Sequence, residues 1–163
     1  MLNKLIPIIT FVLGSFLTLI IFRWKNFIDW KKDARFHNNV LNILKRDLEH
    51  LIKDFEYITQ DEDTKSISIE IINDAGIKNI YYGREILTTC FFSEKVIVHL
   101  IDIVRGIDNI TNNLKNESSM GHEIEQFYYL KFKDILKICK ELFELLNSEY
   151  IELNFKNFRK WNY

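Results

Sequence analysis

The feature that most constrains this chain is an uncharged apolar run of eighteen residues, LIPIITFVLGSFLTLIIF, from Leu5 to Phe22. As a helix it would span about 27 Å at about 1.5 Å per residue, close to the roughly 30 Å hydrocarbon core of a bilayer. The run is longer than the apolar region of a signal peptide and ends without a small-residue cleavage site. It also lacks the polar stripe of a core helix. The sequence therefore predicts an uncleaved, single-pass membrane anchor over residues 1–25.

Aromatic and cationic side chains follow this run directly, in the stretch FRWKNFIDWKK. Tryptophan favours the headgroup region because its ring is apolar while its N–H needs a partner. Arginine and lysine can bury their stems there and keep their charges in water. We therefore expect Arg23, Trp24, Lys25 and Trp30 to lie at the membrane interface.

The charges that flank the run predict its orientation. Lys4 precedes it, whereas five cations follow it up to residue 35: Arg23, Lys25, Lys31, Lys32 and Arg35. Cytoplasmic flanks carry the excess of lysine and arginine. The N-terminus should therefore lie outside and residues 26–163 in the cytoplasm, which in a bacterium makes the inner membrane the site. Two widely spaced cysteines, Cys90 and Cys139, agree with a reducing compartment.

Composition favours long helices and argues against a nucleic-acid-binding protein. The 163 residues include thirteen phenylalanines but only five glycines and one proline. The net charge of −1 and the pI of about 6.4 argue against binding to long nucleic acids on electrostatic grounds. We expect a mainly α protein, with one N-terminal transmembrane helix followed by a cytosolic helical bundle over residues 26–163.

Beyond the interface, apolar residues recur at alternating gaps of three and four, the pattern of a helix seam. The series is Phe27, Trp30, Ala34, His37, Leu41, Leu44, Leu48, Leu51, Phe55 and Ile58. The seam could join identical chains in a coiled coil or pack against later helices of the same chain. Val40, Ile43 and Ile52 widen the stripe, which favours the intramolecular bundle and still permits a homo-oligomer.

Three later segments complete the predicted domain. Residues 66–82 fit a helix, which we favour, or a short hairpin. Helices are expected from Ser93 to about Lys115 and from about His122 to Phe158. The final FKNFRKWNY, residues 155–163, repeats the aromatic and cationic character of the first interface. It either returns to the membrane beside Trp24 and Trp30 or packs its rings on the bundle.

The sequence contains no recognisable catalytic motif, and no metal site or cofactor is expected. The stretch KNIYYGRE combines aromatic rings, which stack on bases, with cations, which meet phosphates. Lys78, Tyr81, Tyr82 and Arg84 are therefore the candidate ligand-binding residues, with a nucleotide or a protein as the partner.

The order of the anchor, the long helix, the YYGRE turn and a helix ending in IDNITNNL resembles small bacterial single-pass, membrane-anchored helical proteins of unknown function. In architecture it is also similar to the membrane effectors of type III CRISPR antiviral systems that respond to cyclic oligoadenylate. Because the first resemblance is to proteins of unknown function, the leading hypothesis comes from the residues, and it is a non-enzymatic protein whose cytosolic domain binds a partner or small ligand and couples it to the anchor. The second implies a defence effector that binds a cyclic nucleotide, oligomerises and perturbs the membrane.

Overall fold

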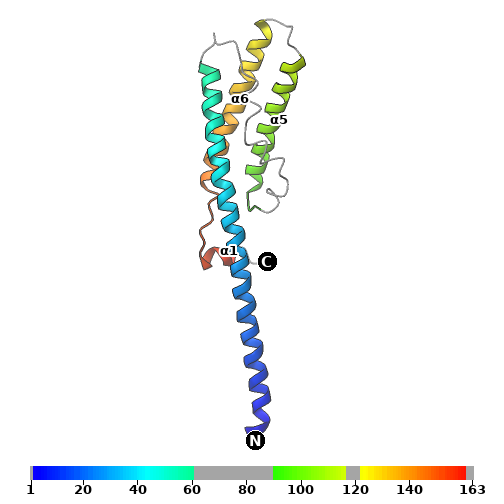
Figure 1. Cartoon of the computed structure of the whole chain (residues 1–163), viewed down its shortest axis with the longest axis vertical. Helices are drawn as coiled ribbons and strands as arrows, with labels where there is room; N and C mark the ends of the chain where they lie inside the picture. Colours follow the sequence, from blue (N-terminus) through cyan, green and yellow to red (C-terminus); the bar gives the residue numbers. More distant parts are fainter. Residues whose placement is uncertain (1, 61–89, 117–121, 161–163) are drawn as a thin grey trace. The chain divides into compact units, whose positions relative to one another are not determined.

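The computed structural model describes residues 2–60, 90–116 and 122–160, and most of these residues are helical (Figure 1). The helices are α1 (Leu2–Gln60), α5 (Glu94–Asn116), α6 (His122–Asn147) and α7 (Phe155–Lys160). No strand occurs within these described ranges, so the prediction of a mainly α protein is confirmed for them. The choice between helix and hairpin at residues 66–82 falls outside the described residues.

The chain divides into two compact units. Unit 1 comprises residues 1–36 and 151–163, and unit 2 comprises residues 37–150. The first part of α1 and all of α7 thus belong to unit 1, whereas the rest of α1 belongs to unit 2 with α5 and α6. The predicted boundary at residue 25 separates an anchor from a cytosolic domain, and it stays a prediction.

The core of unit 2 contains the seam of α1. Leu41, Leu44, Leu48, Leu51 and Phe55 are at most 2% exposed, and they share one hydrophobic cluster with side chains of α5 and α6. The members from these two helices are Val96, Leu100, Ile103, Val104, Ile107 and Ile110, and Phe132, Ile135, Cys139, Leu142 and Leu146. In Figure 1 the cyan part of α1 runs beside α5 and α6. The seam is therefore covered by helices of the same chain.

The bounds of α5 agree with the sequence prediction. Glu94 occupies the first turn, where a negative charge is favoured by the helix dipole. The first backbone bond runs from the Ile97 N–H to the Ser93 carbonyl, 3.2 Å away. Apolar residues then recur on one face through Ile110, and this face is the buried one.

The prediction of one helix from His122 to Phe158 is wrong at its C-terminal end. α6 ends at Asn147, where the N–H groups of Ser148 and Glu149 bond the carbonyls three residues earlier, at 3.0 and 3.3 Å. The Ser148 hydroxyl also donates to the Leu145 carbonyl at 2.7 Å. Such bonds satisfy carbonyls that a longer helix would use, and serine side chains compete with the helix in this way. Residues 148–154 are not helical, and α7 begins anew at Phe155.

Candidate membrane-interface site

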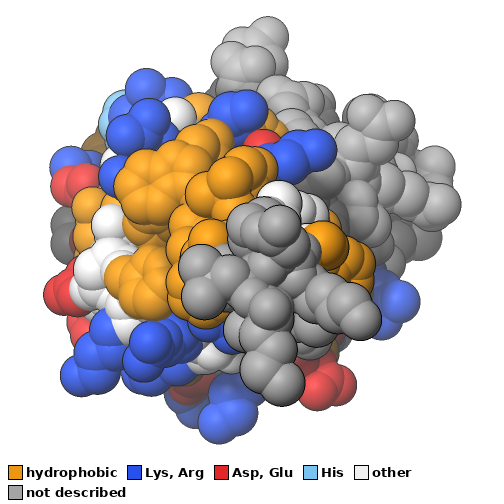
Figure 2. Space-filling view, turned by 90° about the horizontal axis from the view of Figure 1, so that it is seen from below, with side chains coloured by type: hydrophobic (Ala, Val, Ile, Leu, Met, Phe, Trp, Pro, Cys, Tyr) orange, Lys and Arg blue, Asp and Glu red, His pale blue; other side chains and the backbone are white. Residues whose placement is uncertain are grey.

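The first part of α1 presents large apolar side chains on all sides. Nine of them between Phe11 and Phe22 are 50–75% exposed: Phe11, Val12, Leu13, Phe16, Leu17, Leu19, Ile20, Ile21 and Phe22. The end-on view of Figure 2 shows hydrophobic side chains gathered on the near face, with lysine and arginine side chains beside them. By length and composition α1 can cross a membrane, and none of its most apolar window is buried.

One polar side chain within this stretch, Thr18, is satisfied locally. The Thr18 hydroxyl donates to the Gly14 carbonyl one turn earlier, at 2.8 Å. A hydroxyl bonded in this way presents little unpaired polarity to an apolar surrounding, because its proton is already engaged. Thr18 is therefore compatible with burial in hydrocarbon.

Unit 1 also contains an aromatic cluster of four rings. Phe27 and Trp30 come from α1, just after the apolar stretch, and Phe155 and Phe158 come from α7. Phe27 lies 5.5 Å from Phe155 and 5.3 Å from Phe158, edge to face, and Trp30 lies 5.7 Å from Phe158. Each helix contributes two rings spaced three residues apart, which places them on one face. Tilted aromatic pairs at such distances stabilise by about 0.5–1.5 kcal/mol beyond their buried area.

The cluster forms because the chain restarts a helix at the correct point. The Asn157 N–H donates to the Asn154 side-chain oxygen at 2.8 Å, an N-cap that fixes the start of α7. Glu152 holds this cap, since its carboxylate accepts from the Asn154 amide and its carbonyl accepts from the Asn157 amide. The cap orients Phe155 and Phe158 towards α1.

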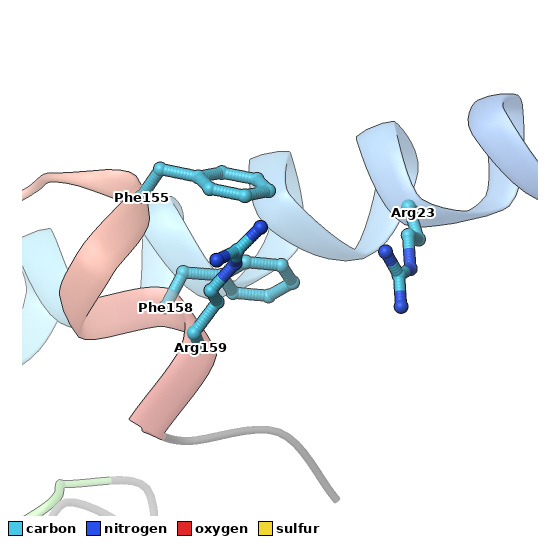
Figure 3. A pocket seen from close by; sticks show the side chains of 4 residues that line it. All are labelled: Arg23, Phe155, Phe158 and Arg159. Carbon is cyan, nitrogen blue, oxygen red and sulfur yellow. The ribbon is translucent and has the colours of Figure 1, made fainter.

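Two cations lie against rings of the cluster. The Lys31 ammonium lies 5.6 Å from the Phe27 ring centre and the Arg159 guanidinium 5.3 Å from the Phe155 ring centre, both within cation–π range. Arg23, Phe155, Phe158 and Arg159 line a pocket of about 310 Å³. Figure 3 shows the Arg159 side chain beside the two phenylalanine rings and Arg23 extending from α1.

The charges are distributed unequally between the two units. Unit 1 contains nine lysines and arginines and three acids, a net charge of +6, whereas unit 2 contains thirteen and twenty, a net charge of −7. These values add to the whole-chain charge of −1. The near-neutral total thus conceals a cationic unit that contains the exposed apolar helix.

The structure locates the four residues predicted for the interface in unit 1. Trp24 is 64% exposed, and Arg23 and Lys25 are exposed as well. Trp30 is instead 7% exposed inside the aromatic cluster, and its N–H has no hydrogen-bond partner in the described part of the chain. Their membrane role stays a prediction.

The sequence did not single out Phe155, Phe158 and Arg159 as site residues. The signal available was the repeated mixture of rings and cations in residues 155–163, which raised the possibility of contact with Trp24 and Trp30. The other candidates, Lys78, Tyr81, Tyr82 and Arg84, lie outside the described residues, so their role in binding also stays a prediction.

In unit 2, His37, Ser93 and Glu149 form a polar cluster. His37 Nε2 lies 2.9 Å from the Glu149 carbonyl oxygen, and the Phe91 N–H donates to His37 Nδ1 at 3.1 Å. Ser93 contacts the Glu149 carboxylate with both its hydroxyl and its N–H. Both ring nitrogens of His37 are thus engaged by backbone groups, so the imidazole cannot take a proton from Ser93 in this arrangement.

The two cysteines are buried and unpaired, and burial raises the pKa of Cys90 to about 11 and that of Cys139 to about 12. Thiols of this kind are poor nucleophiles because little thiolate forms near neutral pH. No group of three or more His, Cys, Asp or Glu side chains that could hold a metal occurs among the described residues.

Comparisons of the chain with protein-family models, curated proteins and solved structures found no match. The resemblances drawn from the sequence pattern therefore stay hypotheses.

Proposed function

We propose that this chain is a non-enzymatic, single-pass membrane protein whose first helix anchors a cytosolic helical bundle. The observation that supports this proposal best is the exposure of nine large apolar side chains between Phe11 and Phe22. On an insertion scale, such residues favour the membrane by about 0.3–0.6 kcal/mol each, or about 3–5 kcal/mol in total. Left in water, an apolar surface of this extent would drive association between chains.

The orientation and compartment follow from charge. The excess of cations after Phe22 supports a cytoplasmic location for unit 2, with the inner membrane of a bacterium as the site. The net charge of +6 in unit 1 adds to this, because the cytoplasmic leaflet attracts juxtamembrane cations by about 1 kcal/mol each.

The proposed role of the bundle is to bind a protein partner or a small ligand and to couple that event to the anchor. α1 supports this, because one uninterrupted helix contributes both the apolar stretch and the seam in the core of unit 2. A ligand that changes the packing of the seam would act on the same helix that crosses the membrane.

Membrane anchoring is tested by fractionating cells that express the full chain and washing the membranes with alkaline carbonate. The wild-type protein should stay in the washed membranes. The double variant Leu13→Arg/Leu17→Arg should leave them, because arginine near the centre of a span costs about 2.5–3.5 kcal/mol per residue. The cost of two such arginines exceeds the membrane insertion energy of about 3–5 kcal/mol given above.

The matched control is Leu130→Arg, which makes the same change at a leucine of α6 that is 56% exposed, close to the 62% and 59% of Leu13 and Leu17. This control should remain in the membrane fraction. Extraction of the wild-type chain by carbonate, or equal retention of both arginine variants, would contradict the proposed anchor.

A further inference from the structure

The pocket of unit 1 contains two arginines whose charges no described carboxylate neutralises. Among the described residues its lining is Arg23, Phe155, Phe158 and Arg159, with no acidic side chain among them. In the described part of the chain neither guanidinium forms an ion pair. Of the three acids of unit 1, Asp29 lies 3.6 Å from Lys32, and Glu152 holds the cap of α7. Two like charges on one pocket favour an anion between them.

The chemistry of the lining defines the anion further. Guanidinium groups offer paired N–H donors that match the oxygens of a phosphate. The two phenyl rings supply an apolar wall, and Phe155 is still 46% exposed. A volume of about 310 Å³ is at the lower end of the range for small-molecule sites. The pocket therefore fits a phosphate that carries an apolar group.

The place of the pocket along α1 indicates where such a molecule comes from. Phe22 is the last residue of the uncharged apolar run, and Arg23, the next residue, lines the pocket. If residues 5–22 cross the hydrocarbon, Arg23 lies at the depth of the lipid phosphates. An acyl chain attached to a phosphate in the pocket could then follow the apolar surface of α1.

We propose that this pocket binds the phosphate of an anionic glycerophospholipid between Arg23 and Arg159, with Phe155 and Phe158 against its glycerol and acyl region. The proposal rests on the membrane anchoring proposed above. Lipid binding would hold α7 against α1 at the membrane surface. Unit 1 would then bind an anionic lipid selectively, in addition to the general attraction of its cations to anionic membranes.

The test uses the full chain in mixed micelles of a nonionic detergent with equal amounts of phosphatidylglycerol and phosphatidylcholine, and native mass spectrometry counts the lipids retained. The wild-type protein should retain phosphatidylglycerol preferentially. In Arg23→Gln/Arg159→Gln this preference should fall by about tenfold, because two charged hydrogen-bond donors to the phosphate are lost.

A matched control removes the same charge from the same unit outside the pocket. Lys156→Gln/Lys160→Gln should keep the wild-type preference to within about twofold, since neither lysine lines the pocket and exposed surface charge is screened by salt. Arg23→Lys/Arg159→Lys keeps both charges but not the planar fork, and it should show an intermediate preference. This variant also decides the question if the glutamine pair does not fold.

Four results would overturn the proposal. Equal losses in the two glutamine pairs would show a diffuse electrostatic effect. Displacement of the lipid by glycerol 3-phosphate or inorganic phosphate at equal concentration would show a site for a soluble phosphate. Failure of the wild-type chain to float with phosphatidylcholine vesicles would refute the anchor itself, whereas flotation without lipid preference would refute the lipid site alone.

Discussion

At the scale of single residues, His37 shows how a seam position can hold a polar side chain. It is fully buried, and its ring accepts from the Phe91 N–H at Nδ1 while Nε2 faces the Glu149 carbonyl. Only the neutral tautomer with a proton on Nε2 satisfies both contacts. His37 is therefore a structural histidine that is hydrogen-bonded within the seam.

The pH dependence of stability follows from this histidine. Burial lowers the pKa of His37 below its ordinary value of 6.5, against a smaller opposite effect of the Glu149 carbonyl and carboxylate. The unfolded chain therefore takes up the proton first as pH falls, so stability is full above about pH 6.5 and decreases below it. Thermal melts of the full chain in detergent should show a lower Tm at about pH 5.5 than at about pH 7.5.

His37→Gln tests the assignment. The variant should be less stable at neutral pH by about 1–3 kcal/mol, because buried backbone groups lose well-placed partners, and its Tm should change less with pH. The exposed His50 provides the control, and His50→Gln should keep the wild-type pH profile. An unchanged pH profile in His37→Gln would contradict the role given to the imidazole.

At the scale of the elements, the spacing of apolar residues predicted which face of a helix is buried but not where a helix ends. The three-four spacing identified the buried face of α1, and from Trp30 to Phe55 every seam position is buried. The end of α6 was missed because Tyr150 and Leu153 continue the helical spacing past Asn147. Hydrogen bonds from Ser148 and Glu149 end the helix there, and the spacing of apolar residues carries no information about such bonds.

The aromatic cluster was only partly predictable for a related reason. Both of its segments were recognised as aromatic and cationic, but the contact of Phe27 with Phe158 depends on where α7 begins. The Asn154 cap sets that point, and a single continuous helix from His122 to Phe158 would have no cap there. The pocket between Arg23 and Arg159 likewise requires the break before α7, so periodicity alone could not reveal it.

The packing of α5 on α6 gives a prediction at this scale. A Cβ at Gly106 would lie 2.8 Å from Ile135 Cδ1 and 2.9 Å from its Cγ1, and Ile135 is itself buried. Alanine in a helix is favoured over glycine by about 1 kcal/mol, but overpacking costs about 1–3 kcal/mol. Gly106→Ala should therefore lower the free energy of unfolding by up to about 2 kcal/mol, measured by denaturant titration in detergent.

The effect of Gly106→Ala on the free energy of unfolding should change sign when the clash with Ile135 is removed. In an Ile135→Ala background, which is itself destabilised by about 2–5 kcal/mol, Gly106→Ala should be neutral or stabilising. A Cβ added at Gly14 would meet nothing within 4 Å, so Gly14→Ala should leave the stability of unit 2 unchanged. Additive losses in the double variant would rule out the close helix contact as the cause.

At the scale of the whole molecule, one helix joins two unlike units. Unit 1 is cationic and includes the exposed apolar stretch, whereas unit 2 is acidic and contains the hydrophobic core. This division suits a chain whose one part meets an anionic membrane surface while the other stays in water. Composition averaged over the whole sequence conceals it, because the charges of the two units nearly cancel.

The proposed membrane crossing of residues 5–22 is tested most directly by labelling single cysteines with a membrane-impermeant maleimide in sealed vesicles of each orientation. Cys90 and Cys139 provide a silent background, since both are buried and their thiol pKa values are raised to about 11 and about 12. We expect Asn3→Cys to be labelled only from the outside, Tyr57→Cys only from the cytoplasmic side, and Ser15→Cys from neither. Labelling of Asn3→Cys and Tyr57→Cys from the same side, or of Ser15→Cys in sealed vesicles, would contradict the crossing.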